Sequence, residues 1–283
     1  MTHKLTALVD GSTYSKSVCD HAAWIARRAE LDVELMHVLG RREAGGGSDL
    51  SGSIALGARS TLLNELSELD EQRAKLALQR GRAILDDAKA LLEDAGIAVK
   101  AHLRHGDLVE AIAQKETEAE MVLIGKRGEA ADFATEHLGS NLDRVMRAVG
   151  KPLFVASRAF QAINRVLIAF DGSPSATRAV EYVARSPLYA GLELKVVTFG
   201  PTTDAAEKSL ANAQATLSAA GRDAKTEIRP GQPDEALGRL IEEERFDHLV
   251  MGSSGHTRFR AFFVGSTTIE MLRVCRVPIL LVK

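Results

Sequence analysis

The sequence has few of the residues that mark several large classes of protein. Only two of its 283 residues are cysteines, Cys19 and Cys275, and they lie in different halves. This argues against a disulfide framework and predicts two buried, reduced thiols. No apolar run approaches the roughly 20 residues that a membrane-spanning helix needs. A predicted strand begins close to Met1 and leaves no room for a signal peptide, so we expect a cytoplasmic location.

Strong charge and standard catalytic motifs are also missing. The net charge is -2 and the sequence pI is about 6.5, so no general basic field attracts nucleic acid. The sequence contains no P-loop, and no Gly-x-Gly-x-x-Gly follows the first predicted strand, which excludes standard kinase or GTPase machinery. No convincing set of a base and a nucleophile is present, so the sequence predicts at most weak catalysis.

What the sequence does have is a pattern that occurs twice. An apolar run ends in Asp-Gly-Ser at residues 10–12 and again at residues 171–173. Each half then contains a glycine pair, a Gly-Ser dipeptide and a closing apolar strand that follows a proline. In the first half these are Gly125 with Gly128, Gly139-Ser140 and Pro152. In the second half they are Gly252 with Gly255, Gly265-Ser266 and Pro278. Self-similarity on this scale predicts two copies of one domain, over residues 1–157 and 165–283.

Short apolar strands alternate with helices in both copies. We expect strands near 4–9, 32–38, 97–104, 120–124 and 152–156 in the first half, and near 165–171, 192–199, 223–229, 247–251 and 277–282 in the second. In the second half, helices are expected over 174–190, 204–220 and 233–244, and from about residue 265. This alternation predicts an α/β fold of two doubly wound parallel sheets, with ligands at the carboxyl ends of the strands.

The first half carries an insertion. The Asp-Gly-Ser triplets are 161 residues apart and the glycine pairs 127 apart, so 34 extra residues lie in the first half, between about 41 and 95. A loop is expected at 45–48, followed by a long or broken amphipathic helix whose apolar residues are Leu62, Leu63, Leu66, Leu69, Leu85, Ala88, Leu91 and Leu92. The insertion is either an elaborated crossover helix or a lid or docking surface.

The glycines of the second half have a spacing that suits an anion. Gly252 and Gly255 follow a strand, and after nine intervening residues Gly265-Ser266-Thr267 opens a helix. Small residues let main-chain N–H groups approach a phosphate, and the helix directs its free amides and positive dipole end to the same place. The hydroxyls of Ser266 and Thr267 could also donate to phosphate oxygens. The alternative is two ordinary glycine turns and an N-capped helix.

This spacing, together with Asp-Gly-Ser after the first strand, resembles the universal stress protein family and its tandem members. The resemblance covers nearly the whole chain apart from the insertion. It implies five-stranded sheets of order 3-2-1-4-5, the adenine nucleotide alpha hydrolase-like fold. It also implies ATP or a related adenine nucleotide as ligand, a regulatory role in the stress response, and Mg²⁺ bound with the nucleotide.

The resemblance assigns roles to residues of the second half. It places Gly252, Gly255, Gly265 and Ser266 against phosphate and ribose, with Thr267 as a further N–H donor. It places Asp171 beside the nucleotide and its Mg²⁺, although an Asx turn before the next helix is an equal interpretation. The main chain at Val197 and Thr198 corresponds to the adenine contact. Neighbours within these motifs complete the predicted site, and they are Gly172, Ser173, Ser253 and His256.

The first half departs from the pattern. Ten residues separate Gly128 from Gly139, and three of them are acidic. A weaker second site is therefore expected, either occupied or vestigial, formed by Asp10, Gly125, Gly128, Gly139, Ser140 and Asn141. His37, His102 and His105 lie at neighbouring strand ends and make a metal site conceivable there, but surface or hydrogen-bonded histidines are favoured.

Three functions remain open from the sequence. The first is a regulatory protein that binds ATP chiefly in the second half. The second is a nucleotide-independent scaffold that binds a protein or an apolar ligand through the first half. The third is a slow ATPase or a nucleotide-dependent transferase. For all three, the strands 152–156 and 277–282 are expected to pair antiparallel inside the chain, and a homodimer and an unknown protein partner are expected.

Overall fold

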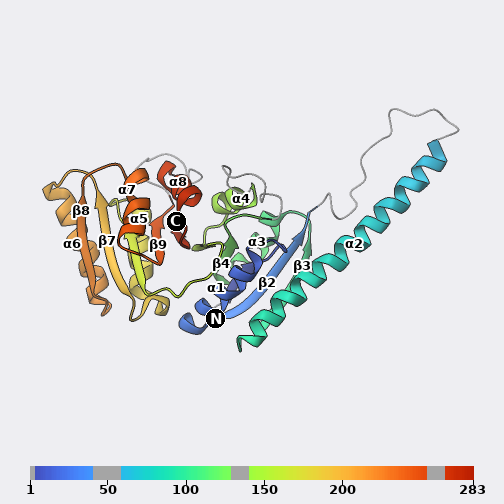
Figure 1. The fold of residues 1–283 in the computed structure, drawn as a ribbon, viewed down its shortest axis with the longest axis horizontal. Coiled ribbons are helices and arrows are strands. Elements are labelled where there is room, and N and C mark those ends of the chain that lie inside the picture. The colour runs from blue at the N-terminus through green and yellow to red at the C-terminus, as the bar shows by residue number, and fades with distance from the viewer. Residues whose placement is uncertain (1–3, 41–58, 129–139, 254–264) are drawn as a thin grey trace.

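A single sheet passes through both halves of the molecule. The computed structural model describes residues 4–40, 59–128, 140–253 and 265–283. Its ten strands have the order β3-β2-β1-β4-β5-β10-β9-β6-β7-β8 (Figure 1). Each half therefore has the order 3-2-1-4-5 with parallel pairing throughout, which confirms the predicted fold.

The predicted strands and helices are present, with boundaries shifted by one or two residues in most cases. The first half contains β1 (Lys4–Leu8), α1 (Ser15–Ala29), β2 (Asp32–Leu39), α2 (Arg59–Asp94), β3 (Val99–His105), α3 (Leu108–Glu116), β4 (Ala119–Gly125), α4 (Ser140–Ala148) and β5 (Leu153–Ala156). The second half contains β6 (Arg165–Ala169), α5 (Pro174–Arg185), the 3₁₀ helix η2 (Pro187–Tyr189), β7 (Glu193–Phe199), α6 (Asp204–Ala219), β8 (Ala224–Arg229), α7 (Pro233–Glu243), β9 (His248–Gly252), α8 (Ser266–Val274) and β10 (Ile279–Val282).

One helix is shorter than predicted. The apolar periodicity predicted a helix over 174–190, but α5 ends at Arg185. Ser186 is extended, with φ -75° and ψ 127°, because Pro187 disfavours a helical conformation in the residue before it. The proline was visible in the sequence and was the signal for the earlier end.

The two halves join edge to edge. Strand β5 pairs antiparallel with β10, and Phe154 lies opposite Leu280, which confirms the predicted internal pairing. Two lysines cross this seam in opposite directions. The Lys126 ammonium donates to the carbonyl of Cys275 (2.6 Å) at the end of α8, and Lys283 donates to the carbonyl of Arg147 (2.8 Å) in α4. Each half therefore satisfies carbonyls at a helix C-terminus of the other.

The insertion forms one continuous helix of 36 residues, α2, rather than a broken one. Its second part packs on the sheet through Leu85, Ala88 and Leu92, which are almost fully buried. Gly81 allows this approach, because a Cβ there would lie 2.9 Å from Leu103 and 3.0 Å from His37. Its first part extends away from the body of the domain (Figure 1). The segment 41–58, which includes the expected loop, lies outside the described residues.

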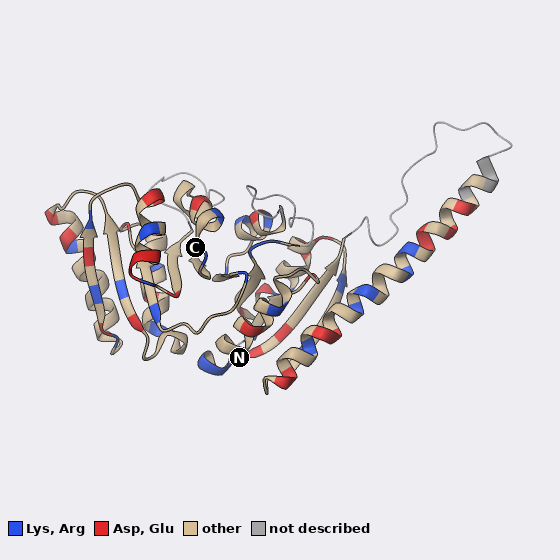
Figure 2. Cartoon of the chain, in the orientation of Figure 1, with Lys and Arg blue, Asp and Glu red and all other residues tan. Residues whose placement is uncertain are grey.

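Charged side chains of both signs are interspersed over both halves (Figure 2), and the net charge of the chain is -2. Both cysteines are buried free thiols, as expected. Within the described residues, every helix is too short or too polar to cross a membrane.

Candidate functional site

A cavity of about 250 Å³ lies in the second half, at the carboxyl ends of β6, β7 and β9. This is the edge of the sheet where parallel α/β folds bind ligands. One wall is apolar and is formed by Ala169, Val197, Phe199, Leu237 and Met251. A polar rim is formed by Asp171, Ser173, Gly252, Gly265, Ser266 and Thr267. The cavity therefore brings together residues that the sequence predicted from three separate motifs.

Helix α8 begins at this rim. Its N-cap residue is Gly265, and no side chain of the described residues caps the helix. The first amides of a helix have no partner within the helix, so those of Ser266, Thr267 and Thr268 and the positive end of the dipole are available at the cavity. The amide of Gly265 donates to the Ser253 carbonyl (3.1 Å), which fixes the start of α8 against the end of β9. This arrangement suits an anionic group.

The hydroxyl of Thr267 is already used. It donates to the Asp234 carboxylate at the start of α7. The next hydroxyl, that of Thr268, donates to the Gly252 carbonyl (3.3 Å). The predicted hydroxyl contact from Thr267 to a phosphate therefore competes with an existing hydrogen bond, whereas its backbone amide does not.

Gly252 has a structural reason to be glycine that the sequence did not show. A Cβ at this position would lie 2.4 Å from the Ser175 hydroxyl and 2.7 Å from the Ala176 amide nitrogen. The end of β9 thus passes directly against the first turn of α5, where no side chain fits. Close packing of helix on strand is sufficient to explain this glycine, although it also lines the cavity.

The Asp-Gly-Ser triplet forms a turn and a helix cap. The Asp171 carboxylate accepts from the Ser173 amide (2.9 Å), and Gly172 has a φ of 73°. The Ser173 hydroxyl in turn accepts from the Ala176 amide (3.2 Å) and caps α5. The Asx-turn interpretation is therefore correct for these contacts. Asp171 is also exposed and lines the cavity, so its turn does not remove it from the site.

The main chain at the end of β7 points to a residue that the sequence analysis missed. The Val197 carbonyl accepts from the Phe170 amide (2.9 Å), so it is occupied by the neighbouring strand. Thr198 pairs with Ile228 on the other side, in β8. Backbone groups alternate in direction along a strand, so those of Phe199 point to the same side as Val197, beyond the end of β6. Counting this alternation would have found Phe199.

The weaker site of the first half is only partly described. A Cβ on Gly128 would lie 2.8 Å from the Asp10 carboxylate, so these two predicted residues do meet. Ser140 begins α4 and Asn141 is exposed in its first turn. Gly125 is instead packed against Tyr14, whose Cβ would lie 2.8 Å from a Cβ at residue 125. Gly139, and likewise Gly255 and His256 of the second half, lie outside the described residues.

The three histidines of the first half do not gather. His37 and His102 lie on adjacent strands but face opposite sides of the sheet, because Met36 is the partner of His102. The His37 ring bonds to the Val9 carbonyl (2.7 Å), and His105 is exposed. Within the described residues, no three histidine, cysteine or acidic side chains are grouped to hold a metal ion.

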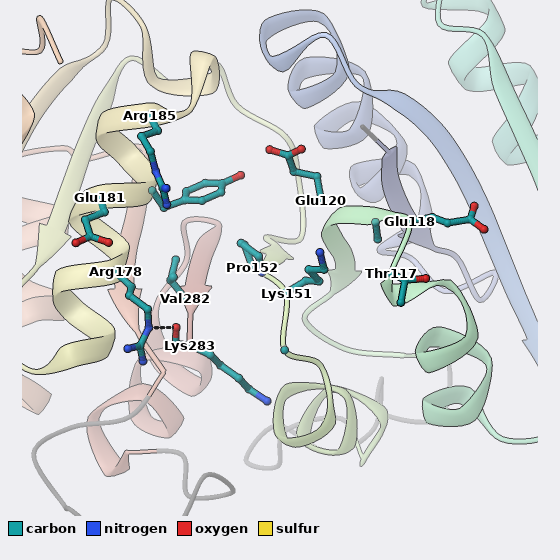
Figure 3. A pocket seen from close by; sticks show the side chains of 13 residues that line it. Thr117, Glu118, Glu120, Lys151, Pro152, Arg178, Glu181, Arg185, Val282 and Lys283 are labelled. Carbon is teal, nitrogen blue, oxygen red and sulfur yellow. Dashed lines mark hydrogen bonds between the residues drawn. The ribbon is translucent and has the colours of Figure 1, made fainter. Parts of the chain in front are cut away.

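A larger hollow, of about 620 Å³, lies at the seam between the halves (Figure 3). It is lined by side chains of both signs, including Lys151, Arg178 and Arg185 on one hand and Glu118, Glu120 and Glu181 on the other. Arg178 of α5 donates to the carbonyl of Lys283, and both residues belong to the second half. We regard the smaller cavity as the candidate site, because it alone of the two combines an apolar wall with an open helix N-terminus.

Comparison with known proteins gives a consistent result. The model described as the universal stress protein family matches residues 1–157 and 162–283. The chain is 36% identical over 276 residues to universal stress protein Slr1230 of Synechocystis, covering 96% of each chain. It is 27% identical over 206 residues to universal stress protein Rv2005c of Mycobacterium tuberculosis, covering 66% of this chain and 70% of that one. A universal stress protein structure from Archaeoglobus fulgidus has a similar fold, with a TM-score of 0.71 at 22% identity, covering 100% of this chain and 99% of that one.

Proposed function

The chain belongs to the universal stress protein family, and on this premise we propose that it is a stress-response regulatory protein that binds ATP or a related adenine nucleotide, chiefly in its second half. The observation that carries the proposal is the uncapped N-terminus of α8 at the polar rim of the second-half cavity. The apolar wall suits the flat face of a base, and the α8 amides suit phosphate.

The proposal assigns a part to each predicted residue group. Phosphate lies against the amides at Gly265, Ser266 and Thr267, and the base meets the end of β7, where Phe199 rather than Thr198 offers its main chain. Mg²⁺ is carried with the nucleotide, and the exposed Asp171 carboxylate is its nearest candidate ligand from the protein. The first half, with its longer glycine spacing, is proposed to bind nucleotide weakly or not at all.

We include three further points in the proposal. The domain boundaries are 1–157 and 165–283, the chain forms a homodimer, and it acts in the cytoplasm together with a protein partner. They rest on the repeat, on the symmetry common among soluble oligomers, and on the two free thiols.

Titration of the full chain with Mg-ATP, by isothermal calorimetry and by thermal unfolding, tests the nucleotide site. One nucleotide should bind per chain, and a ligand at 100 times its Kd should add about 2.7 kcal/mol to the free energy of unfolding. Gly265→Val should abolish this binding while the fold is kept, because a side chain would occupy the place of the anion.

Gly238→Val is the matched control. Gly238 lies in α7 of the same half, and a Cβ there meets nothing within 4 Å. This variant should bind as the wild type does. Unchanged affinity in Gly265→Val, or no binding by the wild type, would count against the site and favour the nucleotide-independent scaffold. Release of ADP during the same incubation would favour the ATPase or transferase.

A further inference from the structure

The first part of α2 contributes no buried side chain among the residues that the structure describes. Between Leu62 and Arg80 none of the described side chains is buried, and the first buried residue of the helix is Gly81. The helix nevertheless continues without a break over these turns. Helices draw most of their stability from packing of an apolar face, and intrahelical ion pairs such as Glu71–Lys75 (2.7 Å) add only about 0.2–0.5 kcal/mol.

This projecting segment, residues 62–80, presents a regular apolar line. Leu62, Leu69 and Leu76 recur every seven residues and are 38%, 49% and 65% exposed. A seven-residue repeat keeps one side of a helix facing a partner helix in a left-handed coiled coil. At about 100° per residue, the three leucines lie on a different side of α2 from Leu85 and Leu92, which face the sheet. They are therefore a second apolar face, separate from the one that the domain uses.

Charge along the segment is divided into two blocks. Residues 65–71 contain four acidic side chains and no basic one, whereas residues 73–82 contain four basic side chains and no acidic one (Figure 2). Two copies that run antiparallel, with their two-fold axis near residue 72, place each acidic block opposite a basic block. A parallel pair would place like charges together. The charge blocks therefore favour a second copy of the same helix as the partner. They also favour an antiparallel direction, because only that direction places opposite charges together.

We propose that residues 62–80 of α2 pair antiparallel with the same segment of a second copy of the chain. This inference supplies a surface for the homodimer proposed above and is independent of nucleotide binding. Leu69 and Leu76 of the two copies meet at the centre of the seam, with Leu62 at its end, and the exposed Glu65 beside the seam meets Arg80 of the other copy. The interface is isologous and closed, so it gives a dimer rather than a filament.

Sedimentation of the full chain over a range of concentrations tests the surface. Leu69→Glu should raise the dimer dissociation constant by about a hundredfold, because it removes a central leucine from both copies and buries charge. Leu91→Glu is the matched control, since Leu91 is on the same helix, is 38% exposed and lies outside the segment. This control should dimerise as the wild type does.

Charge reversal tests the direction of pairing. Glu65→Arg and Arg80→Glu should each weaken the dimer roughly tenfold, and the double variant should restore it, because each reversal acts at two symmetric contacts. A parallel pair would show no such rescue. A dimer that survives Leu69→Glu overturns this surface but not the homodimer, and a wild-type monomer overturns both. Calorimetry with Mg-ATP on Leu69→Glu should give wild-type affinity, which keeps the outcome separate from that of the nucleotide site.

Discussion

The two halves carry opposite charges at the same place in the same fold. Strand registers make Glu34 on β2 the counterpart of Lys195 on β7, since each lies opposite the third residue of the first strand of its half. Glu34 contacts Lys4 at 2.7 Å, and Lys195 contacts Glu227 at 2.6 Å. A buried charge requires a partner of opposite sign, whichever sign it has. The fold therefore constrains the pairing at this position and leaves the sign free.

The seam shows a second difference between the halves. Registers make His248 on β9 the counterpart of Met121 on β4. The His248 ring stacks on Phe154, with centroids 5.1 Å apart, and bonds to the Tyr189 hydroxyl (3.1 Å). The corresponding place in the first half holds an aliphatic side chain. Close packing along the seam is thus achieved with two different chemistries at this position.

The glycine that ends the fourth strand gives the largest expected difference between the halves. A Cβ on Gly252 would meet the Ala176 backbone nitrogen at 2.7 Å and the Ser175 hydroxyl at 2.4 Å, whereas the nearest atom to a Cβ on Gly125 would be the Tyr14 Cβ at 2.8 Å. Gly252→Ala should therefore lower the free energy of unfolding by about 3 kcal/mol, and Gly125→Ala by about 1.5 kcal/mol. Urea unfolding measures both, and equal losses would show that the second half relaxes as easily as the first.

The inverted charges give the next effect. Glu34→Gln leaves Lys4 and Lys115 with Glu118, which is half exposed. Lys195→Met leaves both of its glutamates paired with Arg229, at 2.7 and 2.5 Å. We expect a loss of about 2 kcal/mol for Glu34→Gln and about 1 kcal/mol for Lys195→Met, since only the first leaves poorly compensated buried charge.

The same urea experiment includes a surface control. Lys16→Met removes an exposed pair with Asp20 and should change the free energy of unfolding by less than about 0.5 kcal/mol. A larger loss for Lys195→Met than for Glu34→Gln would show that Arg229 does not compensate.

The sequence predicted the fold well because its signals are local. Short apolar strands, prolines at helix starts and glycines at turns all act within a few residues, and together they gave the order of strands and helices. The resemblance supplied the strand order. The length of α5 was wrong by five residues, because apolar periodicity was followed past the restriction that Pro187 imposes.

The candidate site was predicted less completely because its geometry depends on contacts between distant residues. The reason for Gly252 to be glycine is a helix 76 residues earlier in the sequence, at Ala176. The Thr267 hydroxyl is taken by Asp234 from another helix. Lys126 is next to Gly125 in the sequence, but its ammonium donates to the carbonyl of Cys275 in the other half, and burial there lowers its pKa to about 8. None of these contacts leaves a pattern in the sequence near the residue concerned.

The seam gives the smallest of the three effects and the one that depends on pH. Burial lowers the pKa of His21 in α1 to about 4, and its ring packs edge-on against Phe160 with centroids 5.0 Å apart. An unfolded histidine has a pKa of about 6.5, so below that pH the unfolded state takes up a proton that the folded state does not. Stability is therefore fully present above pH 6.5 and is lost as the pH falls toward 4. His21→Leu removes the group that binds this proton in the unfolded state. Between pH 6 and pH 5 the free energy of unfolding of the wild type should therefore fall by about 1 kcal/mol more than that of the variant.

Tyr182 stands 161 residues after His21, at the corresponding place in the second half, and provides the matched control for this pH series. Burial raises the pKa of its hydroxyl to about 12, so it does not titrate in acid. Tyr182→Phe should keep the full acid slope of the wild type in urea unfolding, whatever its effect on stability at neutral pH. His248 is unchanged in both variants, and burial depresses its pKa to about 3, so it contributes the same slope to each curve. The free energy of unfolding of His21→Leu and of the wild type could instead fall equally between pH 6 and pH 5. That result would show that His21 is not held neutral in the folded protein, and that its replacement by Tyr182 in the second half makes no difference to acid sensitivity.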